Sequence, residues 1–410
     1  SFAAFSAFWA QAAAPPTADS SDSVRQAVEQ AVSKVKPALV RIHVVQFDFS
    51  EGREVKFQAS GSGVIITPEG HIVTNHHVAG DTRRIFCTLA DKREVEADLV
   101  GADPLSDIAI VKLRGAPGET FPYAAFGDST LLRVGDRVLA MGSPLALSQS
   151  VTMGIVSNVE MTMPRLFGGA DAFTLDEEDV GSLVVWIGHD AEIYPGNSGG
   201  PLVNLAGEIV GINEVKIGLG GAIPGNLVKG VTQELMARGS VRRAWLGLEV
   251  QPLLKNSAMK HGVLVSNVLK DSPAEKAGFQ PGDVILKLAG RDVTARFHEE
   301  IPRFNLLQMN LPIGEAAEAV VLRGGNEHAL RATPVERENV RAEGRELPAW
   351  GFSASDVSML ASKELKRKDK SGVLVTGVRP GGPSGEAKPP LQWRDVVVEV
   401  AGKVVRSLAD

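Results

Sequence analysis

Cysteine is nearly absent from this chain, since Cys87 is the single one among 410 residues. One cysteine allows no intramolecular disulfide and no cysteine-based zinc site, so the composition predicts neither a disulfide scaffold nor a bound metal or other cofactor. Cys87 lies in the apolar run "IFCTLA". It is therefore expected to be a small buried apolar residue.

An excess of one charge sign is also missing. Lys and Arg number 43 and Asp and Glu 49, which gives a net charge of −6 and argues against a surface for nucleic acid. No Gly-rich Lys-Ser/Thr phosphate loop occurs, so the chain is not expected to use ATP. No long apolar run follows the first residues, and stable membrane insertion of the mature chain is not expected. The length nevertheless predicts two or three domains.

The first residues, "SFAAFSAFWAQAAAPP", are small, apolar and aromatic. The triplet Ala10-Gln11-Ala12 fits the A-x-A pattern of a signal-peptide cleavage site. We interpret residues 1–20 as the remnant of a secretory signal and a linker, which predicts a periplasmic or otherwise extracytoplasmic protein. The alternatives are a disordered Ala/Pro linker or a short membrane anchor, although the run is shorter than the roughly 20 residues that span a bilayer.

The next segment changes from helical to extended periodicity. Val24, Val28 and Val32 recur at helical spacing and Pro37 ends the pattern, which predicts a helix. Short β-branched runs separated by Gly, Pro, Asp and Asn then continue for roughly 200 residues. Because helices do not alternate with these runs, the pattern predicts a mainly β fold built from barrels or sandwiches and disfavours a parallel α/β fold.

Three polar residues stand at the ends of predicted strands. His77 lies in "TNHHV", Asp107 in "SDIAIVKL", and Ser198 in "PGNSGGPLVN". A serine hydroxyl becomes a nucleophile when an imidazole takes its proton and a carboxylate orients the imidazole. Gly196 and Gly199 let the backbone bend and aim N–H groups at one point. Taken singly, each residue is equally compatible with a structural role, as a strand-end histidine, a turn aspartate or a hairpin serine.

Together these motifs resemble those of the HtrA-type (Deg) serine proteases, and the resemblance covers residues 20–410. It implies a chymotrypsin-like double β-barrel with the active site between the barrels. It also implies that His77 is the general base, Asp107 its orienting partner and Ser198 the nucleophile. The backbone N–H groups of Gly196 and Ser198 would form the oxyanion hole. His76 precedes the catalytic histidine and has no part in the triad.

The C-terminal part of the chain repeats a pattern. "AWLGLEVQ" followed by "GVLVSNV" recurs as "AWGFSASD" followed by "GVLVTGV", which indicates an internal duplication. The two copies resemble PDZ domains of the α+β class, which bind peptide C-termini as an added strand. The carboxylate-binding loops would be Trp245, Leu246, Gly247 and Leu248 in the first copy and Trp350, Gly351 and Phe352 in the second. The alternative is that these residues are ordinary hydrophobic strand starts, and the irregular "PGGPSGEAKPPLQW" predicts a degenerate groove in the second copy.

The expected organisation is a trypsin-like protease domain at 21–240, a first PDZ domain at 241–340 and an incomplete second PDZ domain at 341–410. The resemblance implies an ATP-independent endopeptidase that degrades unfolded or damaged proteins in the cell envelope through an acyl-enzyme. The alternative function is a chaperone or peptide-binding adaptor with a largely inactive protease domain. The acidic segment 161–186 is either a sensor loop or a solvated insertion.

The resemblance also implies a homotrimer of protease domains, or a multiple of it. The valine-striped N-terminal helix, with Phe47 and Phe49 after it, supplies apolar surface for such an assembly. The same helix could instead cover its own barrel.

Overall fold

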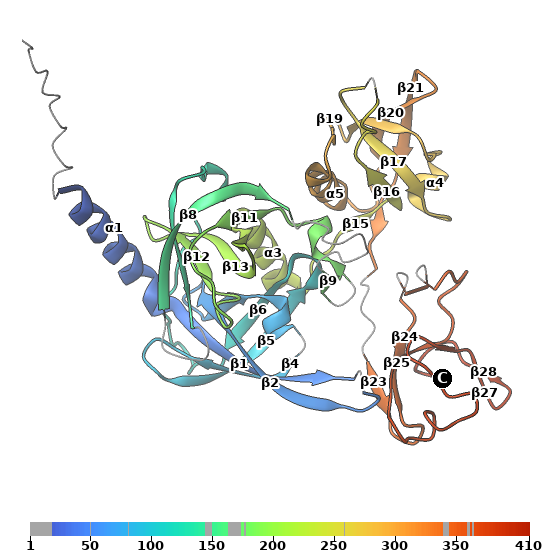
Figure 1. Cartoon of the computed structure of the whole chain (residues 1–410), viewed down its shortest axis with the longest axis horizontal. Helices are drawn as coiled ribbons and strands as arrows, with labels where there is room; N and C mark the ends of the chain where they lie inside the picture. The colour runs from blue at the N-terminus through green and yellow to red at the C-terminus, as the bar shows by residue number, and fades with distance from the viewer. Residues whose placement is uncertain are drawn as a thin grey trace, which may run out of the picture.

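A computed structural model describes residues 19–49, 51–80, 82–143, 150–162, 174–175, 178–257, 259–338, 344–358, 361–362 and 365–410. Residues 1–18 of the predicted leader remnant and linker, and half of segment 161–186, lie outside these residues. Figure 1 shows a two-barrel body followed by two smaller C-terminal units. Among the described residues, no helix combines the length and apolar character needed to cross a membrane.

The first barrel closes six antiparallel strands in the order β1-β2-β3-β6-β5-β4. The strands are β1 Leu39–Asp48, β2 Val55–Ile65, β3 His71–Thr74, β4 Thr82–Thr88, β5 Glu94–Asp103 and β6 Ile108–Leu113. β6 lies between β3 and β5 in the barrel, and nearly every residue of its run Ile108–Leu113 is buried. Cys87 on β4 is buried as expected, and this burial raises the pKa of its thiol to about 12.

The second barrel also closes six antiparallel strands, in the order β11-β14-β13-β12-β7-β8. They are β7 Arg137–Gly142, β8 Ser150–Met161, β11 Trp186–His189, β12 Pro201–Asn204, β13 Ile209–Ile217 and β14 Leu219–Pro224. The short strands β9 Thr174–Leu175 and β10 Glu178–Asp179 pair beside it. The mainly β prediction, with a chymotrypsin-like pair of barrels, is confirmed.

Two long helices pack on the barrels. α1 Asp19–Val35 ends just before Pro37, as the sequence predicted. Ala31 and Val35 on α1 are fully buried in the barrel core, while its N-terminal turns extend away from the body (Figure 1). The second half of the helix therefore covers its own barrel, which was the alternative to a role between subunits. α3 Gly225–Arg238 leads from the second barrel to the next unit.

The third unit is a sheet in the order β16-β17-β18-β20-β21, with β19 paired to β18 and two short helices. Its elements are β15 Ala244–Trp245, β16 Leu248–Gln251, β17 Val263–Val268, α4 Pro273–Lys276, β18 Val284–Leu288, β19 Arg291–Asp292, α5 Ile301–Met309, β20 Ala317–Arg323, β21 Asn326–Ala332 and β22 Val335–Glu336. This unit has its own hydrophobic core, which includes Leu246 and Leu248. β16 lies at the edge of the sheet, where a further strand could pair.

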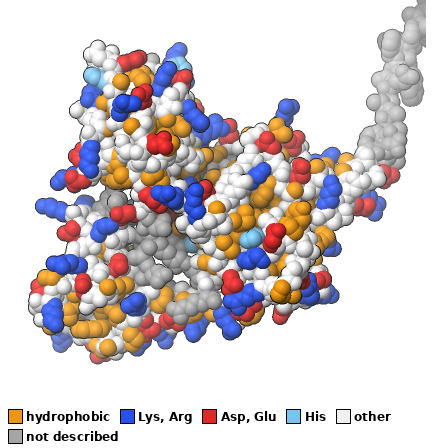
Figure 2. Space-filling view, turned by 180° about the vertical axis from the view of Figure 1, so that it is seen from behind, with side chains coloured by type: hydrophobic (Ala, Val, Ile, Leu, Met, Phe, Trp, Pro, Cys, Tyr) orange, Lys and Arg blue, Asp and Glu red, His pale blue; other side chains and the backbone are white. Residues whose placement is uncertain are grey.

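The C-terminal unit contains a sheet in the order β23-β24-β25-β26 and a separate hairpin. Its strands are β23 Arg345–Leu347, β24 Phe352–Asp356, β25 Val373–Val378, β26 Val396–Val397, β27 Glu399–Val400 and β28 Lys403–Val404. The hairpin of β1 and β2 reaches this unit, because Ser353 Oγ donates to the Phe49 carbonyl and the Glu54 N–H donates to Glu346. In the view of Figure 2, acidic and basic side chains alternate across the surface among exposed apolar ones.

Candidate active site

Two consecutive tight turns present Ser198. The Asn197 N–H donates to the Tyr194 carbonyl over 2.9 Å, and Gly196 has a φ of 99° at the third position of that turn. The next turn closes through Gly200 N–H and the Asn197 carbonyl, with Gly199 at φ 84°. A positive φ at the third position is the type II pattern, which requires glycine. The sequence "YPGNSGG" therefore places Ser198 at the second position of the second turn, where it is half-buried shortly before β12.

Ser62 on β2 holds this loop from the opposite barrel. Its N–H donates to the Ser198 carbonyl over 2.9 Å, and its hydroxyl donates to the Gly196 carbonyl over 2.6 Å. A Cβ on Gly199 would stand 2.2 Å from the Ser62 carbonyl, so no other residue fits at this crossing. Ser62 was not predicted as a site residue. The small triplet "GSG" at 61–63 was the only signal of a close backbone approach.

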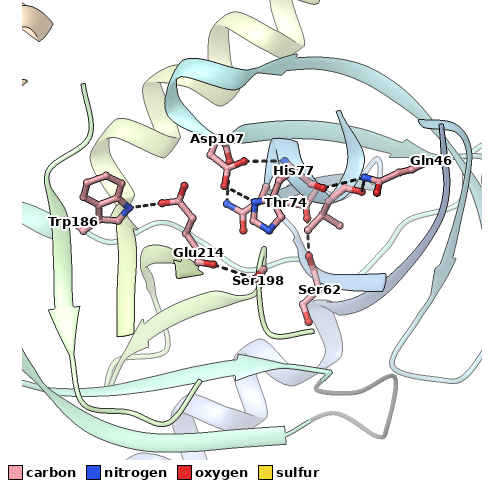
Figure 3. Close-up of polar contacts among 10 residues, drawn as sticks. Gln46, Ser62, Thr74, His77, Asp107, Trp186, Ser198 and Glu214 are labelled. Carbon is pink, nitrogen blue, oxygen red and sulfur yellow. Dashed lines mark hydrogen bonds and ion pairs between the residues drawn. The ribbon is translucent and has the colours of Figure 1, made fainter. Parts of the chain in front are cut away.

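His77 and Asp107 come from the first barrel. His77 lies in the one-turn helix α2 His76–Ala79 after β3, and Asp107 follows the 3₁₀ turn Pro104–Ser106 directly before β6. His77 Nδ1 and Asp107 Oδ2 are 2.7 Å apart, and the His77 N–H donates to Asp107 Oδ1 over 2.9 Å (Figure 3). Asp107 adopts a φ of 51°, a left-handed conformation that aspartate tolerates better than most residues. The carboxylate is thereby fixed against both the ring and the backbone of one histidine.

The electrostatics of this pair favour a basic imidazole. Burial lowers the pKa of His77, but the charge of Asp107 and its hydrogen bond raise that pKa by more, so the net shift is upward from 6.5. The Asp107 side chain is fully buried, while the His77 side chain remains about 32% exposed. An oriented, half-exposed imidazole with a raised pKa can accept a proton from a neighbouring hydroxyl.

Ser198 Oγ donates to the backbone carbonyl of Glu214 on β13 over 3.1 Å. Ser198, His77 and Asp107 therefore lie together in the structure, with Glu214 beside them (Figure 3). The Ser198 hydroxyl is turned to the Glu214 carbonyl and donates no hydrogen bond to His77. Glu214 was not singled out from the sequence. A lone carboxylate inside the apolar strand "EIVGINEV" was the available signal.

The amides of Gly196 and Ser198, predicted as the oxyanion hole, flank this site. Within the described part of the chain, neither amide donates to a backbone carbonyl, whereas those of Asn197, Gly199 and Gly200 all do. Two such amide donors, one on each side of Asn197, can stabilise an oxyanion that develops beside Ser198.

Comparisons with known proteins agree with this geometry. The Trypsin-like peptidase domain family matches residues 61–212, and the PDZ domain family matches residues 234–305. A probable periplasmic serine endoprotease DegP-like of Ectopseudomonas mendocina (strain ymp) is 38% identical over 344 residues, which cover 80% of this chain and 67% of that protein. This chain belongs to the HtrA/DegP family of serine endoproteases.

Other curated relatives and solved structures are also similar to this HtrA-type protease. The corresponding protein of Brucella suis biovar 1 (strain 1330) is 33% identical, over 86% of this chain and 67% of that protein. The solved structure of the HtrA-type protease AlgW with decapeptide has a TM-score of 0.63 at 31% identity, and covers 76% of this chain and 99% of that one. The serine endoprotease from Yersinia pestis has a TM-score of 0.57 at 30% identity.

The predicted peptide loop of this HtrA-type protease lies before β16 in the PDZ domain. Gly247 has a φ of 77°, and a Cβ there would stand 2.3 Å from Ser272 Cβ. The carbonyls of Leu246 and Gly247 accept from Ala274 and Leu269, each over 2.9 Å. Within the described residues, the amides of Leu246 and Gly247 donate to no backbone carbonyl. They therefore remain available beside the open edge of β16.

The second copy has the same loop but a different edge. The carbonyls of Trp350 and Gly351 accept from Ser384 and Arg379, as in the first copy. The amides of Trp350 and Gly351, however, both donate to the Leu347 carbonyl over 3.0 Å. The edge of β24 pairs with β23, so the chain itself occupies the place where a peptide would add. The PDZ family match ends at 305, and a second PDZ domain remains a prediction from the repeat.

Proposed function

We propose that Ser198, His77 and Asp107 form the catalytic triad of this endoprotease. The observation that supports it most directly is the double contact of Asp107 with the ring and backbone of His77, beside a serine held in a glycine turn. In the resting arrangement the serine proton points to the Glu214 carbonyl. A rotation about the Ser198 side-chain bond redirects it to the free ring nitrogen of His77.

The reaction then follows ordinary acyl transfer. Ser198 Oγ attacks the scissile carbonyl carbon, a carbon–oxygen bond forms, and the hydroxyl proton passes to His77 Nε2. The oxyanion is stabilised by the Gly196 and Ser198 amides. The carbon–nitrogen bond breaks as His77 protonates the leaving amine, and water then hydrolyses the acyl-enzyme by the same steps. Each step uses side chains and backbone of this chain, with no nucleotide involved.

The substrates we propose are unfolded or damaged proteins of the periplasm. The support is the family membership and the naming of the curated relatives as periplasmic serine endoproteases. The first PDZ domain would recruit or sense peptide C-termini through Trp245, Leu246, Gly247 and Leu248, by strand addition to β16. A catalytically poor chaperone or adaptor is disfavoured by the family membership and by the contacts of Asp107 with both the ring and the backbone of His77.

Contacts between the PDZ domain and the barrels support coupling of the two sites. Arg337 pairs with both oxygens of Glu178 at 2.5 and 2.6 Å, and Asn305 on α5 donates to the Ser182 carbonyl over 2.8 Å. Residues 178–182 belong to segment 161–186, for which the sequence left a sensor loop and a solvated insertion as alternatives. Four residues after Ser182 comes Trp186, whose indole N–H donates to Glu214 beside the triad. A bound peptide that shifts α5 would change the contact between α5 and this segment.

The trimer remains a proposal that rests on the family resemblance. Ala31 and Val35 of α1 pack into the chain's own core, so these two side chains do not supply the interface. Sedimentation of the full chain at micromolar concentration tests the assembly, and a monomer would contradict it.

Active-site labelling tests the function itself. A fluorophosphonate should label the wild type at one serine, and Ser198→Ala should abolish both the label and the hydrolysis of unfolded casein, a loss of about 10⁶-fold. Asp107→Asn should retain the fold and lose about 10⁴-fold, because the imidazole loses its preferred tautomer. Casein hydrolysis by Ser198→Ala at the wild-type rate would contradict the proposal.

A further inference from the structure

Glu214 brings a second carboxyl group to the buried side of the triad. Its side chain leaves β13 and lies between Trp186 and Asp107 (Figure 3). Oε2 accepts a hydrogen bond from the Trp186 indole N–H. Oε1 is buried and meets no N–H or O–H donor among the described residues, and the Asp107 carboxylate lies on that side of Glu214 (Figure 3). Two ionised carboxylates buried side by side would repel each other, so this arrangement favours a proton on one of them.

The other contacts decide which carboxyl holds that proton. Both oxygens of Asp107 face N–H groups of His77, whereas Glu214 Oε1 has no donor of its own among the described residues, so the shared proton is assigned to Glu214. Glu214 receives the Trp186 N–H alone at its Oε2 end. Burial, and after it the charge of Asp107, raise the pKa of Glu214 well above its ordinary value, against a smaller lowering by Trp186. Asp107, with His77 behind it, is the charged partner that faces Glu214, while Trp186 from β11 is neutral.

We infer that Glu214 is a positioning residue of the active site, which in its protonated form donates its O–H to the Asp107 carboxylate. This inference rests on the proposed triad and adds a fourth member to it. The hydrogen bond fixes the Asp107 carboxylate against rotation, so that both of its oxygens stay on His77. The backbone carbonyl of the same residue holds the resting Ser198 hydroxyl. One residue thus contacts both ends of the triad.

An ionised Glu214 would act differently. A second negative charge behind Asp107 would raise the pKa of His77 further, and replacing it with a neutral side chain would shift the acid limb of activity to lower pH. A protonated Glu214 adds no charge. Its replacement by glutamine, whose N–H₂ can donate to Asp107 while its carbonyl accepts from Trp186, should leave that limb in place.

The activity test compares Glu214→Gln with Glu214→Leu on unfolded casein across pH. Glu214→Gln should stay within about threefold of wild-type kcat/KM, whereas Glu214→Leu, of similar volume without a donor, should lose about tenfold to a hundredfold. Glu208→Gln makes the same chemical change on the turn before β13, outside the site, and should leave the profile unchanged. Equal losses in both Glu214 variants, or full activity of Glu214→Leu, would overturn the inference.

A stability test keeps the inference falsifiable if Glu214→Leu does not fold. The folded-state pKa of Glu214 is raised, so its contribution to stability is fully present below about pH 4.5 and is lost as pH rises through the folded pKa. In an inactive Ser198→Ala background, the variant that also carries Glu214→Gln is compared with the one that keeps Glu214. The melting temperature of the first minus that of the second should therefore increase as pH rises above 4.5. A difference that does not change with pH would show an ionised Glu214 and overturn the inference. Neither melting result depends on Ser198 being the nucleophile, which the labelling experiment tests separately.

Discussion

The Ser62 hydroxyl donates a hydrogen bond of 2.6 Å to the carbonyl of Gly196, so a strand of the first barrel holds the turn of the second barrel that presents Ser198. The same hydroxyl accepts the Ser143 N–H over 2.8 Å. One buried side chain therefore connects β2, the end of β7 and the Ser198 loop. Since His77 and Asp107 belong to the first barrel, this connection ties the Ser198 turn to the barrel that carries them.

Ser62→Ala should lower kcat more than it lowers stability. The substitution leaves the Gly196 carbonyl and the Ser143 N–H without their buried partner, which costs about 1–3 kcal/mol of unfolding free energy. It also releases the turn that positions Ser198 and the Gly196 amide, so we expect kcat to fall at least about tenfold. Urea unfolding and casein hydrolysis measure the two effects. Ser60→Ala, at an exposed serine of the same strand, is the matched control; a Ser62 variant with wild-type kcat would contradict the positioning role.

The pH profile should follow the raised pKa of His77. The neutral imidazole is the proposed base, so kcat/KM should fall as pH decreases through the His77 pKa, with a midpoint above 6.5. Asp107→Asn removes the charge that raises this pKa, and the midpoint of its residual activity should move to lower pH. His43→Gln on β1 alters a histidine outside the site and serves as control. A midpoint unaffected by Asp107→Asn would exclude His77 as the titrating group.

A peptide with an apolar C-terminus should raise cleavage of an unrelated reporter substrate. Binding at Leu246, Gly247 and Leu248 adds a strand to β16, next to α5 and its contact with Ser182. A bulky residue at Gly247 should remove the stimulation and keep basal cleavage, because its Cβ would clash with Ser272. An amidated peptide on the wild-type protein is the control that leaves the fold untouched. Stimulation that survives both changes would show that the carboxylate is not what is sensed.

Peptide binding should saturate at one site per chain. The first copy leaves the edge of β16 open, while the second pairs β24 with its own β23 and uses the Trp350 and Gly351 amides on Leu347. Calorimetric titration measures the stoichiometry. Trp245→Ala should weaken binding, and the matched Trp350→Ala, whose side chain is exposed, should leave it unchanged. A stoichiometry of two would mean that β23 is displaced by peptide.

The local motifs were readable in the sequence because each depends on neighbours along the chain. Val24, Val28 and Val32 predicted α1, and Pro195, Gly196 and Gly199 predicted the turns around Ser198. The strand runs predicted the barrels, since alternating β-branched residues and turn residues act over a few positions. The ordered histidine, aspartate and serine motifs were specific enough to name the family.

The residues that only the tertiary structure identified act across long sequence separations. Ser62 lies 134 residues from Gly196, and nothing in "GSG" says which loop it will meet. Glu214 looked like any charged residue in a strand until barrel closure placed its carboxyl against Asp107. The two C-terminal repeats share a loop sequence pattern, yet β23 pairs with the edge of the second repeat while β16 of the first stays at an open edge. Sequence determines local conformation and residue chemistry, whereas hydrogen-bond partners and protonation depend on which strands the fold brings together.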